Sequence, residues 1–163
     1  MVTEPANVES SSLTSVQFTV TVDFDAAPRQ VWEALVDWKG HEAWIPATRV
    51  EVHGDVPTAP GSSFTAWTGV GPLTLEDRMQ VSEASWSSDD RTGRCVIDKV
   101  GPVLEGRAGF VVAPYEGRTR VEWFEDVTVP RLPRVLSPVA ARIGATGFRF
   151  AMRRLNRRLA RIE

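Results

Sequence analysis

Strand-like segments separated by turn residues fill the chain from residue 48 to residue 129, and this succession is the strongest constraint on the fold. The segments cover residues 48–53, 62–70, 73–84, 94–100, 103–113 and 118–129. Turn-forming pairs such as Pro60-Gly61, Gly71-Pro72 and Gly101-Pro102 stand between them. Because the connections are too short for crossover helices, they predict consecutive antiparallel hairpins and exclude a doubly wound parallel sheet.

A further strand and a pair of short helices precede this region. Apolar residues alternate with polar ones from Val16 to Phe24, which predicts a half-buried strand. Pro28 suits the first turn of a helix, and apolar residues recur at helical spacing from Val31 to Trp38. Residues 41–45 can add one short turn before Pro46 ends it.

The C-terminal segment predicts one long amphipathic helix. Its apolar residues are spaced alternately four and three apart, at Ala141, Ala145, Phe148, Met152, Leu155, Leu159 and Ile162. The complete order is a strand, a helical pair, six strands and a long helix. We therefore expect an α+β fold, with a disordered Ser-rich leader at residues 1–15 and a single domain at residues 16–163.

Composition excludes several classes of protein. No apolar run approaches the ~20 residues of a bilayer span, and the N-terminus lacks the basic and apolar parts of a secretory signal. The single cysteine, Cys95, excludes an internal disulfide and a zinc site built on paired thiolates. These features predict a cytoplasmic protein without a metal.

Positive charge gathers at the C-terminus. Nine of the 19 Lys and Arg residues lie in residues 131–163, all of them arginine, beside the single acid Glu163. Such a segment can contact a nucleic acid or an anionic membrane. The alternative that we favour is an Arg-rich helix lying on an acidic sheet. We expect no nucleic acid partner and no stable membrane insertion, because the apolar stripe is needed against the sheet.

The predicted order resembles the helix-grip arrangement, and several local motifs strengthen the resemblance. The segment from Val22 to Leu35, with Ala26-Ala27-Pro28 before Val31-Trp32, is similar to the start of the START-related SRPBCC superfamily, in its polyketide cyclase/dehydrase-like branch. Pro60-Gly61 with Phe64 resembles the beginning of that family's third strand, and residues 117–123 resemble its last strand. The resemblance covers about residues 16–160 and is closest to uncharacterised actinobacterial-type members.

The resemblance implies a START/birch-pollen-allergen-like fold, in which a seven-stranded curved antiparallel sheet wraps a long C-terminal helix, with two short helices after the first strand. It also implies a cavity between sheet and helix that binds a hydrophobic or amphipathic small molecule, lipid-like or polyketide-like. One fold serves many activities, so carrier and enzyme both remain open. The alternative is a polyketide cyclase/dehydrase-type enzyme. A nucleotide cofactor is not expected, since no glycine-rich phosphate loop follows a strand. A monomer or weak homodimer is expected.

Two carboxylates occur on strand faces that are otherwise apolar. Asp77 shares a face with Leu73, Leu75, Met79 and Val81, and Glu125 shares one with Val121 and Trp123. An inward acid is desolvated, which raises its pKa and makes a proton donor or base possible near neutral pH. Asp77 is therefore the candidate catalytic residue. The competing interpretation is that each acid pairs with an inward arginine, or lies where its strand leaves the core.

The faces of the fifth strand of the predicted sheet cannot be told apart from the sequence. Arg94, Val96, Asp98 and Val100 share one face and Cys95, Ile97 and Lys99 the other, and both sets are mixed. If the first set points inward, Arg94 or Asp98 can meet Asp77. Aromatase/cyclase relatives orient polyketide oxygens with an interior arginine and a few hydroxyl or acid groups. Tyr115, the only tyrosine, falls in a turn, and this departure from the resemblance disfavours cyclase chemistry.

The remaining candidates are aromatic and small residues. The residues expected to line the cavity are Trp67, Leu75, Asp77, Met79, Phe110, Trp123, Gly144 and Phe148. Because small residues cluster at 140–147, we expect the cavity under residues 140–148 and solid packing under 150–160. His41 is expected to be a hydrogen-bonded or surface residue, and no residue spacing matches a metal site.

Overall fold

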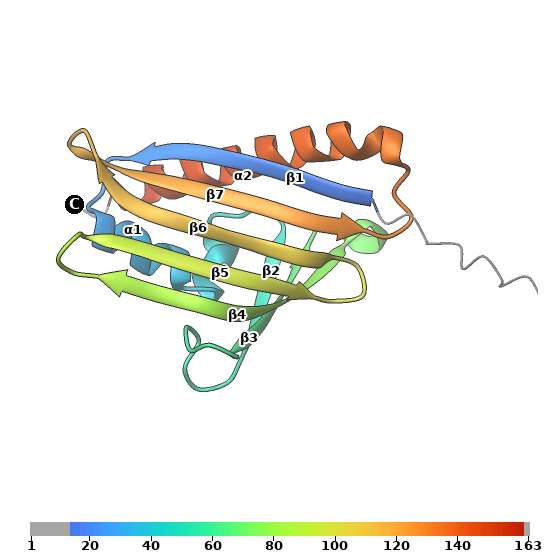
Figure 1. Cartoon of the computed structure of the whole chain (residues 1–163), viewed down its shortest axis with the longest axis horizontal. Helices are drawn as coiled ribbons and strands as arrows, with labels where there is room; N and C mark the ends of the chain where they lie inside the picture. The colour runs from blue at the N-terminus through green and yellow to red at the C-terminus, as the bar shows by residue number, and fades with distance from the viewer. Residues whose placement is uncertain (1–13, 162–163) are drawn as a thin grey trace, which may run out of the picture.

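A computed structural model describes residues 14–161, which form one antiparallel sheet and a long helix (Figure 1). The seven strands are β1 (Thr14–Phe24), β2 (Thr48–His53), β3 (Ser63–Thr68), β4 (Leu75–Ser87), β5 (Thr92–Val100), β6 (Glu105–Tyr115) and β7 (Arg118–Val129). The helices are α1 (Pro28–Val36) and α2 (Ser137–Leu159), and the 3-10 turns are η1 (Lys39–Ala43), η2 (Gly71–Leu73) and η3 (Arg134–Leu136). The predicted order of elements is confirmed.

The sheet runs in the order β1-β7-β6-β5-β4-β3-β2, and every neighbouring pair is antiparallel. Strands β2 to β7 are sequential neighbours, as short hairpins require, and β1 joins the far edge by pairing with β7. The sheet curves, so that β2 and β3 lie at a steep angle to β6 and β7 (Figure 1). This curvature creates a concave inner side.

The N-terminal strand begins two residues earlier than predicted. Thr14 and Ser15 belong to β1, where they pair with Val129 and Thr128. The Thr14 hydroxyl donates a hydrogen bond of 2.6 Å to the carbonyl oxygen of Leu132, which gives this polar residue a buried place. The predicted leader is therefore too long by these two residues, and the rest of it lies outside the described residues.

Local sequence explains the two helical segments that follow β1. Pro28 occupies the first turn of α1, and the Gln30 side chain accepts a hydrogen bond of 3.1 Å from the backbone N–H of Ala27. In η1, the Glu42 carboxylate accepts the backbone N–H of Val50 at 2.7 Å. Because β2 is an edge strand, this backbone N–H has no partner in the sheet, and the Glu42 carboxylate satisfies it.

Strand β4 departs from the prediction at both ends. Residues Gly71–Leu73 form η2, so Leu73 does not extend the strand and is 85% exposed. Further along, the pairing of β4 with β5 shifts between Val81 and Glu83. A bulge of this kind reverses the inward and outward faces of a strand. As a result Trp86, and not its neighbours, packs against the Trp32 ring at 6.0 Å.

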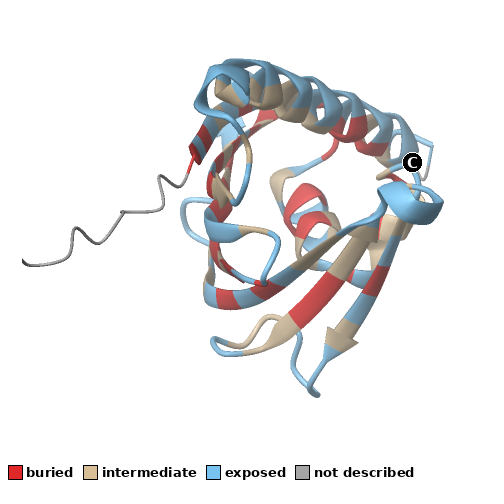
Figure 2. Ribbon diagram, turned by 90° about the vertical axis from the view of Figure 1, so that its right-hand side faces the viewer, coloured by how far each residue is buried: buried red, intermediate tan, exposed pale blue. Residues whose placement is uncertain are grey.

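Helix α2 lies along one edge of the sheet and packs mainly against β1 (Figure 1). Its buried residues are Ala151, Met152 and Leu155, and its outer side is exposed along its length (Figure 2). Phe148 and Leu159 are partly buried on the same side. The predicted apolar stripe therefore faces the sheet, although its last member, Ile162, falls outside the described residues.

Candidate functional site

A cluster of three charged side chains interrupts the apolar inner face of the sheet. Lys99 of β5 forms ion pairs with Asp77 of β4 and, at 3.5 Å from Nζ to Oε2, with Glu125 of β7. The Trp123 indole N–H donates a hydrogen bond of 3.1 Å to Glu125 Oε1, and Lys99 Nζ lies 3.9 Å from the sulfur of Met79. Three strands thus supply one buried site with two carboxylates and one ammonium.

Burial and mutual attraction set the charges of this cluster. Desolvation raises the pKa of Glu125 above its ordinary value, although Lys99 and the Trp123 hydrogen bond oppose the change. Burial alone lowers the pKa of Lys99, but the carboxylates of Glu125 and Asp77 raise it more, so its net pKa lies above the ordinary value. The lysine therefore stays protonated, and Glu125 is harder to ionise than an exposed glutamate.

The members of the cluster differ in access to solvent. The side chains of Lys99 and Glu125 are 5% and 4% exposed, whereas that of Asp77 is 16% exposed. Asp77 Oδ1 is itself buried and accepts no hydrogen bond from the residues that the structure describes. A buried acceptor without a donor is costly. Of the three side chains, that of Asp77 is the most exposed, so it is the member through which the cluster reaches solvent.

An aromatic chain fills the inner side next to the cluster. Ring centroids lie 5.7 Å apart for Trp32 and Phe110, 5.2 Å for Phe110 and Trp123, 4.9 Å for Trp123 and Phe148, and 5.8 Å for Phe148 and Phe18. This series of aromatic rings connects α1, through the sheet, to α2. Phe110 is fully buried in it and has no surface left for a ligand, so its predicted role as a lining residue is wrong. Trp123 is 5% exposed and is held in the same stack.

The other predicted lining residues fall into three environments. Leu75 is 42% exposed and Met79 is 8% exposed, both on the face of β4 that carries Asp77. Trp67 lies on the opposite face of the sheet, paired with Glu76 and covered by the Arg49 guanidinium at 4.1 Å from the ring centroid. Phe148 lies partly buried on α2. The structure thus brings together Leu75, Asp77 and Met79, but separates Trp67 from them.

The space expected beneath the small residues of α2 is occupied by protein. A Cβ atom added to Gly144 would lie 2.6 Å from Cε1 of Phe18, because the helix backbone approaches β1 closely there. Gly144 is therefore a packing residue, and its prediction as part of the cavity wall is wrong. Small side chains draw two elements together as readily as they leave a void.

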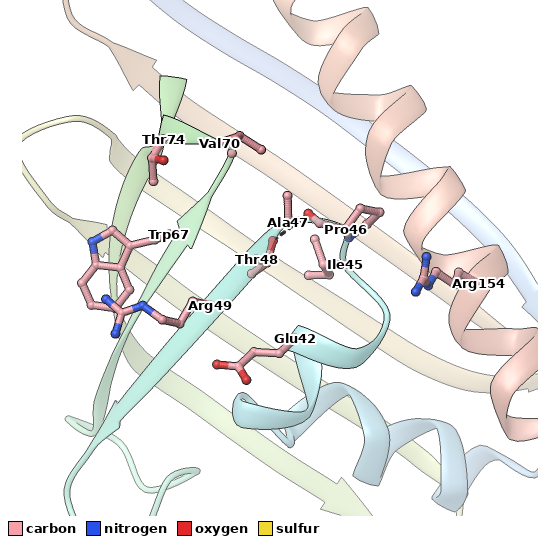
Figure 3. Close-up of a pocket in the computed structure, with 11 residues that line it drawn as sticks. Glu42, Ile45, Pro46, Ala47, Thr48, Arg49, Trp67, Val70, Thr74 and Arg154 are labelled. Atoms are coloured by element: carbon pink, nitrogen blue, oxygen red, sulfur yellow. Dashed lines mark hydrogen bonds between the residues drawn. The ribbon is translucent and has the colours of Figure 1, made fainter. Parts of the chain in front are cut away.

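The pocket of about 540 Å³ lies instead between α2 and the β2–β3 edge (Figure 3). Its lining includes Ile45, Pro46 and Thr48 on one side and Arg154 of α2 on the other, with Val70 and Thr74 at its far end (Figure 3). Because Arg154 belongs to the part of α2 expected to be solidly packed, the predicted placement under residues 140–148 is wrong. Of the predicted lining residues, Trp67 alone lines this pocket.

The inward face of β5 is now determined. Cys95, Ile97 and Lys99 are buried, while Arg94 binds Glu83 and Asp98 binds Ser82 and Arg107 on the outer side. Asp77 therefore meets a lysine and not an arginine. The sequence did contain one signal for this site: Lys99 is one of only two lysines in the chain, set in a strand of buried residues.

The remaining candidates are structural. His41 is buried and its Nε2 donates to the carbonyl oxygen of Leu35 at 2.8 Å, and burial lowers the pKa of His41 to about 4. Burial raises the pKa of the Cys95 thiol to about 12, which makes it a poor nucleophile. Tyr115 ends β6 and lies beneath the Arg120 guanidinium. Within residues 14–161, no group of three or more potential ligands could hold a metal ion.

The curved antiparallel sheet with a long helix along its concave side defines a helix-grip fold of the START type. Similar structures include a protein from Thermobifida fusca (22% identity, TM-score 0.61, covering 91% of this chain and 95% of that one). A STAR-related lipid transfer protein from Xanthomonas axonopodis has 16% identity and a TM-score of 0.65, covering 94% of this chain and 90% of that one. A START superfamily protein from Mycobacterium smegmatis has 11% identity and a TM-score of 0.67, covering 90% and 99%.

Residues 15–161 match the family described as "Polyketide cyclase / dehydrase and lipid transport", and the chain belongs to that family. This confirms the resemblance found in the sequence motifs. No curated protein matches the chain significantly. No helix among residues 14–161 is long and apolar enough to cross a membrane.

Proposed function

We propose that this protein binds a hydrophobic or amphipathic small molecule between α2 and the inner face of β3 and β4. The observation that carries the proposal is the position of α2, which packs on β1 at one edge of the sheet. The inner faces of the strands toward the other edge therefore keep accessible surface, including Leu75 and part of Asp77. An apolar surface with a few convergent polar groups is the usual composition of a small-molecule site.

The charged cluster favours a particular polar end for this ligand. Asp77 is the member that reaches open space, and the two carboxylates outnumber the single ammonium of Lys99. A ligand carboxylate placed there would meet like charge, whereas a hydroxyl group would donate a hydrogen bond to Asp77. We therefore propose a ligand with an apolar body and a neutral hydrogen-bond donor at one end.

Entry to this site is proposed through the pocket between α2 and the β2–β3 edge. The pocket has about 540 Å³, within the range of about 300–1,000 Å³ that is common for small-molecule sites. Strand pairing places the two regions next to each other. Thr48, which lines the pocket, lies opposite Thr68 of β3, which in turn lies opposite Leu75 of β4. The next row on the same face consists of Val50, Ala66 and Asp77. A molecule in the pocket is thus adjacent to the strands that carry the cluster.

The test compares ligands that share a chain and differ at the end. Purified protein is titrated with 1-dodecanol and with dodecanoic acid, and binding is followed by tryptophan fluorescence and native mass spectrometry. We expect dodecanol to bind, and to bind at least about fivefold more tightly than ionised dodecanoic acid at neutral pH. Replacement of Asp77 by Asn should remove most of this preference, because the amide carries no charge.

Two neighbouring leucines give a matched pair of variants for the location of the site. Leu75→Ser changes the inner face of β4, while Leu73→Ser changes the exposed turn η2, two residues away. Both side chains are already exposed, so neither substitution should unfold the protein. Leu75→Ser should weaken dodecanol binding several-fold and Leu73→Ser should leave it unchanged. If no member of the alcohol and acid pair binds, and fatty acids, sterols and aromatic polyketides also fail, the proposed function is wrong.

The enzyme alternative has one observation in its favour. Asp77 and Glu125 flank Lys99 in a buried site, and Glu125 has a raised pKa, so a proton donor and acceptor lie side by side. Such a pair can dehydrate a β-hydroxy ketone by removing an α-proton and protonating the departing hydroxyl. The probe is 4-hydroxy-4-phenylbutan-2-one, whose enone product absorbs in the ultraviolet. Acceleration that Asp77→Asn abolishes would favour the enzyme, and no acceleration would count against dehydration chemistry.

The site needs no cofactor for simple binding, and we propose none. A cytoplasmic location and a monomeric or weakly dimeric state also remain predictions from the sequence. Gel filtration with light scattering measures the oligomeric state directly, and a stable tetramer would contradict it.

A further inference from the structure

The outer side of α2 carries a second row of apolar residues that the sheet does not cover. Val139, Ile143 and Phe150 are 54%, 69% and 52% exposed, and Val135, in η3 just before the helix, is 80% exposed. Their spacing of four, four and seven places them on one side of the helix. Single exposed apolar residues are ordinary, but several on the same side of a helix mark a candidate interaction surface.

Arginines flank and extend this row. Helix α2 contains Arg142, Arg149, Arg153, Arg154, Arg157 and Arg158, and it contains no acidic residue. None of these arginines forms a salt bridge with any residue from 14 to 161. Helix α2 therefore lies on the sheet as expected, and within the described residues the acidic side chains of the sheet do not pair with its arginines.

We propose that this outer side of α2 docks on an anionic membrane surface. Helices that lie in the membrane interface place apolar side chains at the boundary of the headgroups and arginines among the anionic headgroups, and this helix offers both on one side. A nucleic acid would be matched by arginines interleaved with stacking aromatics, whereas the exposed row here is mainly aliphatic. The helix docks without crossing, since its other side is packed on β1.

This placement would also bring the pocket to the membrane. Arg154 lines the pocket between α2 and the β2–β3 edge (Figure 3). It also lies beside Phe150 in a second hollow, together with Arg157, Arg158 and Arg161. The docking surface and the pocket mouth thus share a residue. Docking itself does not depend on what the pocket binds, so it is testable without an identified ligand.

The experiment measures cosedimentation of the full chain with vesicles. Two compositions are used: phosphatidylcholine alone, and phosphatidylcholine mixed with phosphatidylglycerol. We expect binding to the anionic vesicles at low salt, about tenfold weaker binding at high salt, and none to the neutral vesicles. Absence of binding to anionic vesicles at low salt would overturn the proposal.

Paired variants separate the two parts of the surface. Ile143→Ser with Phe150→Ser removes apolar contact, and Val56→Ser with Val100→Ser is the control, because those two side chains are 58% and 56% exposed, in the β2–β3 connection and at the end of β5. We expect the first pair to weaken vesicle binding about tenfold and the second to leave it unchanged. Equal binding by both pairs would overturn the assignment to α2.

Charge is tested in the same way. Arg157→Gln with Arg158→Gln should weaken binding to anionic vesicles about tenfold. Arg91→Gln with Arg94→Gln, in the β4–β5 turn and near the start of β5, removes the same charge and should have little effect. Circular dichroism confirms that each variant is folded. If transfer RNA binds the protein while anionic vesicles do not, the surface belongs to a nucleic acid and the proposal is wrong.

Discussion

Lys99 is a cation buried between two carboxylates, and its removal should destabilise the folded protein. Lys99→Met leaves Asp77 and Glu125 facing each other in a buried environment without a counter-charge. We expect a loss of about 3–5 kcal/mol in the free energy of unfolding at neutral pH, measured by urea denaturation. The loss should be smaller near pH 5, because burial raises the pKa of Glu125 and its protonation removes part of the uncompensated negative charge.

The chain's other lysine is the matched control for this prediction. Lys39 has a side chain that is 64% exposed and pairs with Glu42 at the surface. Lys39→Met should therefore cost no more than about 1 kcal/mol. Equal losses for the two variants would show that burial of Lys99 between the acids does not matter for stability.

His41 gives the protein a pH dependence of known sign. Burial lowers its pKa from 6.5 to about 4 in the folded state, so the unfolded chain takes up the proton first as the pH falls. The stability that the neutral imidazole contributes is complete above about pH 6.5 and is lost progressively between about pH 6.5 and pH 4. The total loss from this residue is about 3 kcal/mol.

The check on this prediction is urea unfolding of the wild type and of His41→Gln near pH 7.5 and near pH 5. Glutamine keeps a donor for the Leu35 carbonyl but does not titrate. The wild type should lose more stability than the variant over this interval. Identical pH dependence of the two proteins would show that His41 is not responsible.

At the scale of elements, two glycines of α2 should respond differently to the same substitution by alanine. A Cβ on Gly147 would meet nothing within 4 Å, so Gly147→Ala should add up to about 1 kcal/mol through helix propensity alone. A Cβ on Gly144 would lie 2.6 Å from Phe18, and Gly144→Ala should therefore lose stability or gain none. Thermal unfolding of both variants measures the difference.

The C-terminal half of α2 is the part that anchors the helix. Leu155 is 3% exposed and belongs to the main core cluster together with Met152 and Ala151. Leu155→Ala should cost about 2–5 kcal/mol, with little direct effect on ligand binding. A cost below about 1 kcal/mol would mean that the helix is held mainly by its contacts near Gly144.

At the scale of the whole molecule, a single hydrophobic core, which includes the series of aromatic rings, joins α1, the sheet and α2. We therefore expect residues 14–161 to unfold in a single cooperative transition. Urea unfolding curves from tryptophan fluorescence and from far-ultraviolet circular dichroism should coincide. An earlier fluorescence transition would show that α2 separates from the sheet before the sheet unfolds.

Periodicity in the sequence was sufficient for the order and type of the elements. In β1, β7 and α2, apolar residues recur with the period of the element because one of its faces is buried. This periodicity can be read from the element's own sequence, without knowing what it packs against. The same alternation placed Asp77 and Glu125 inward. These features depend on local geometry, which the sequence by itself determined.

Only the tertiary structure decided which partners these faces meet. The mixed faces of β5 carry no usable alternation, so Lys99 became visible as the partner of Asp77 only through strand pairing. The bulge after Val81 and the close approach of Gly144 to Phe18 likewise depend on neighbours distant in the sequence. The position of the pocket and the uncovered apolar row on α2 follow from the helix lying on β1. Contacts between distant segments set these features, and no local pattern encodes them.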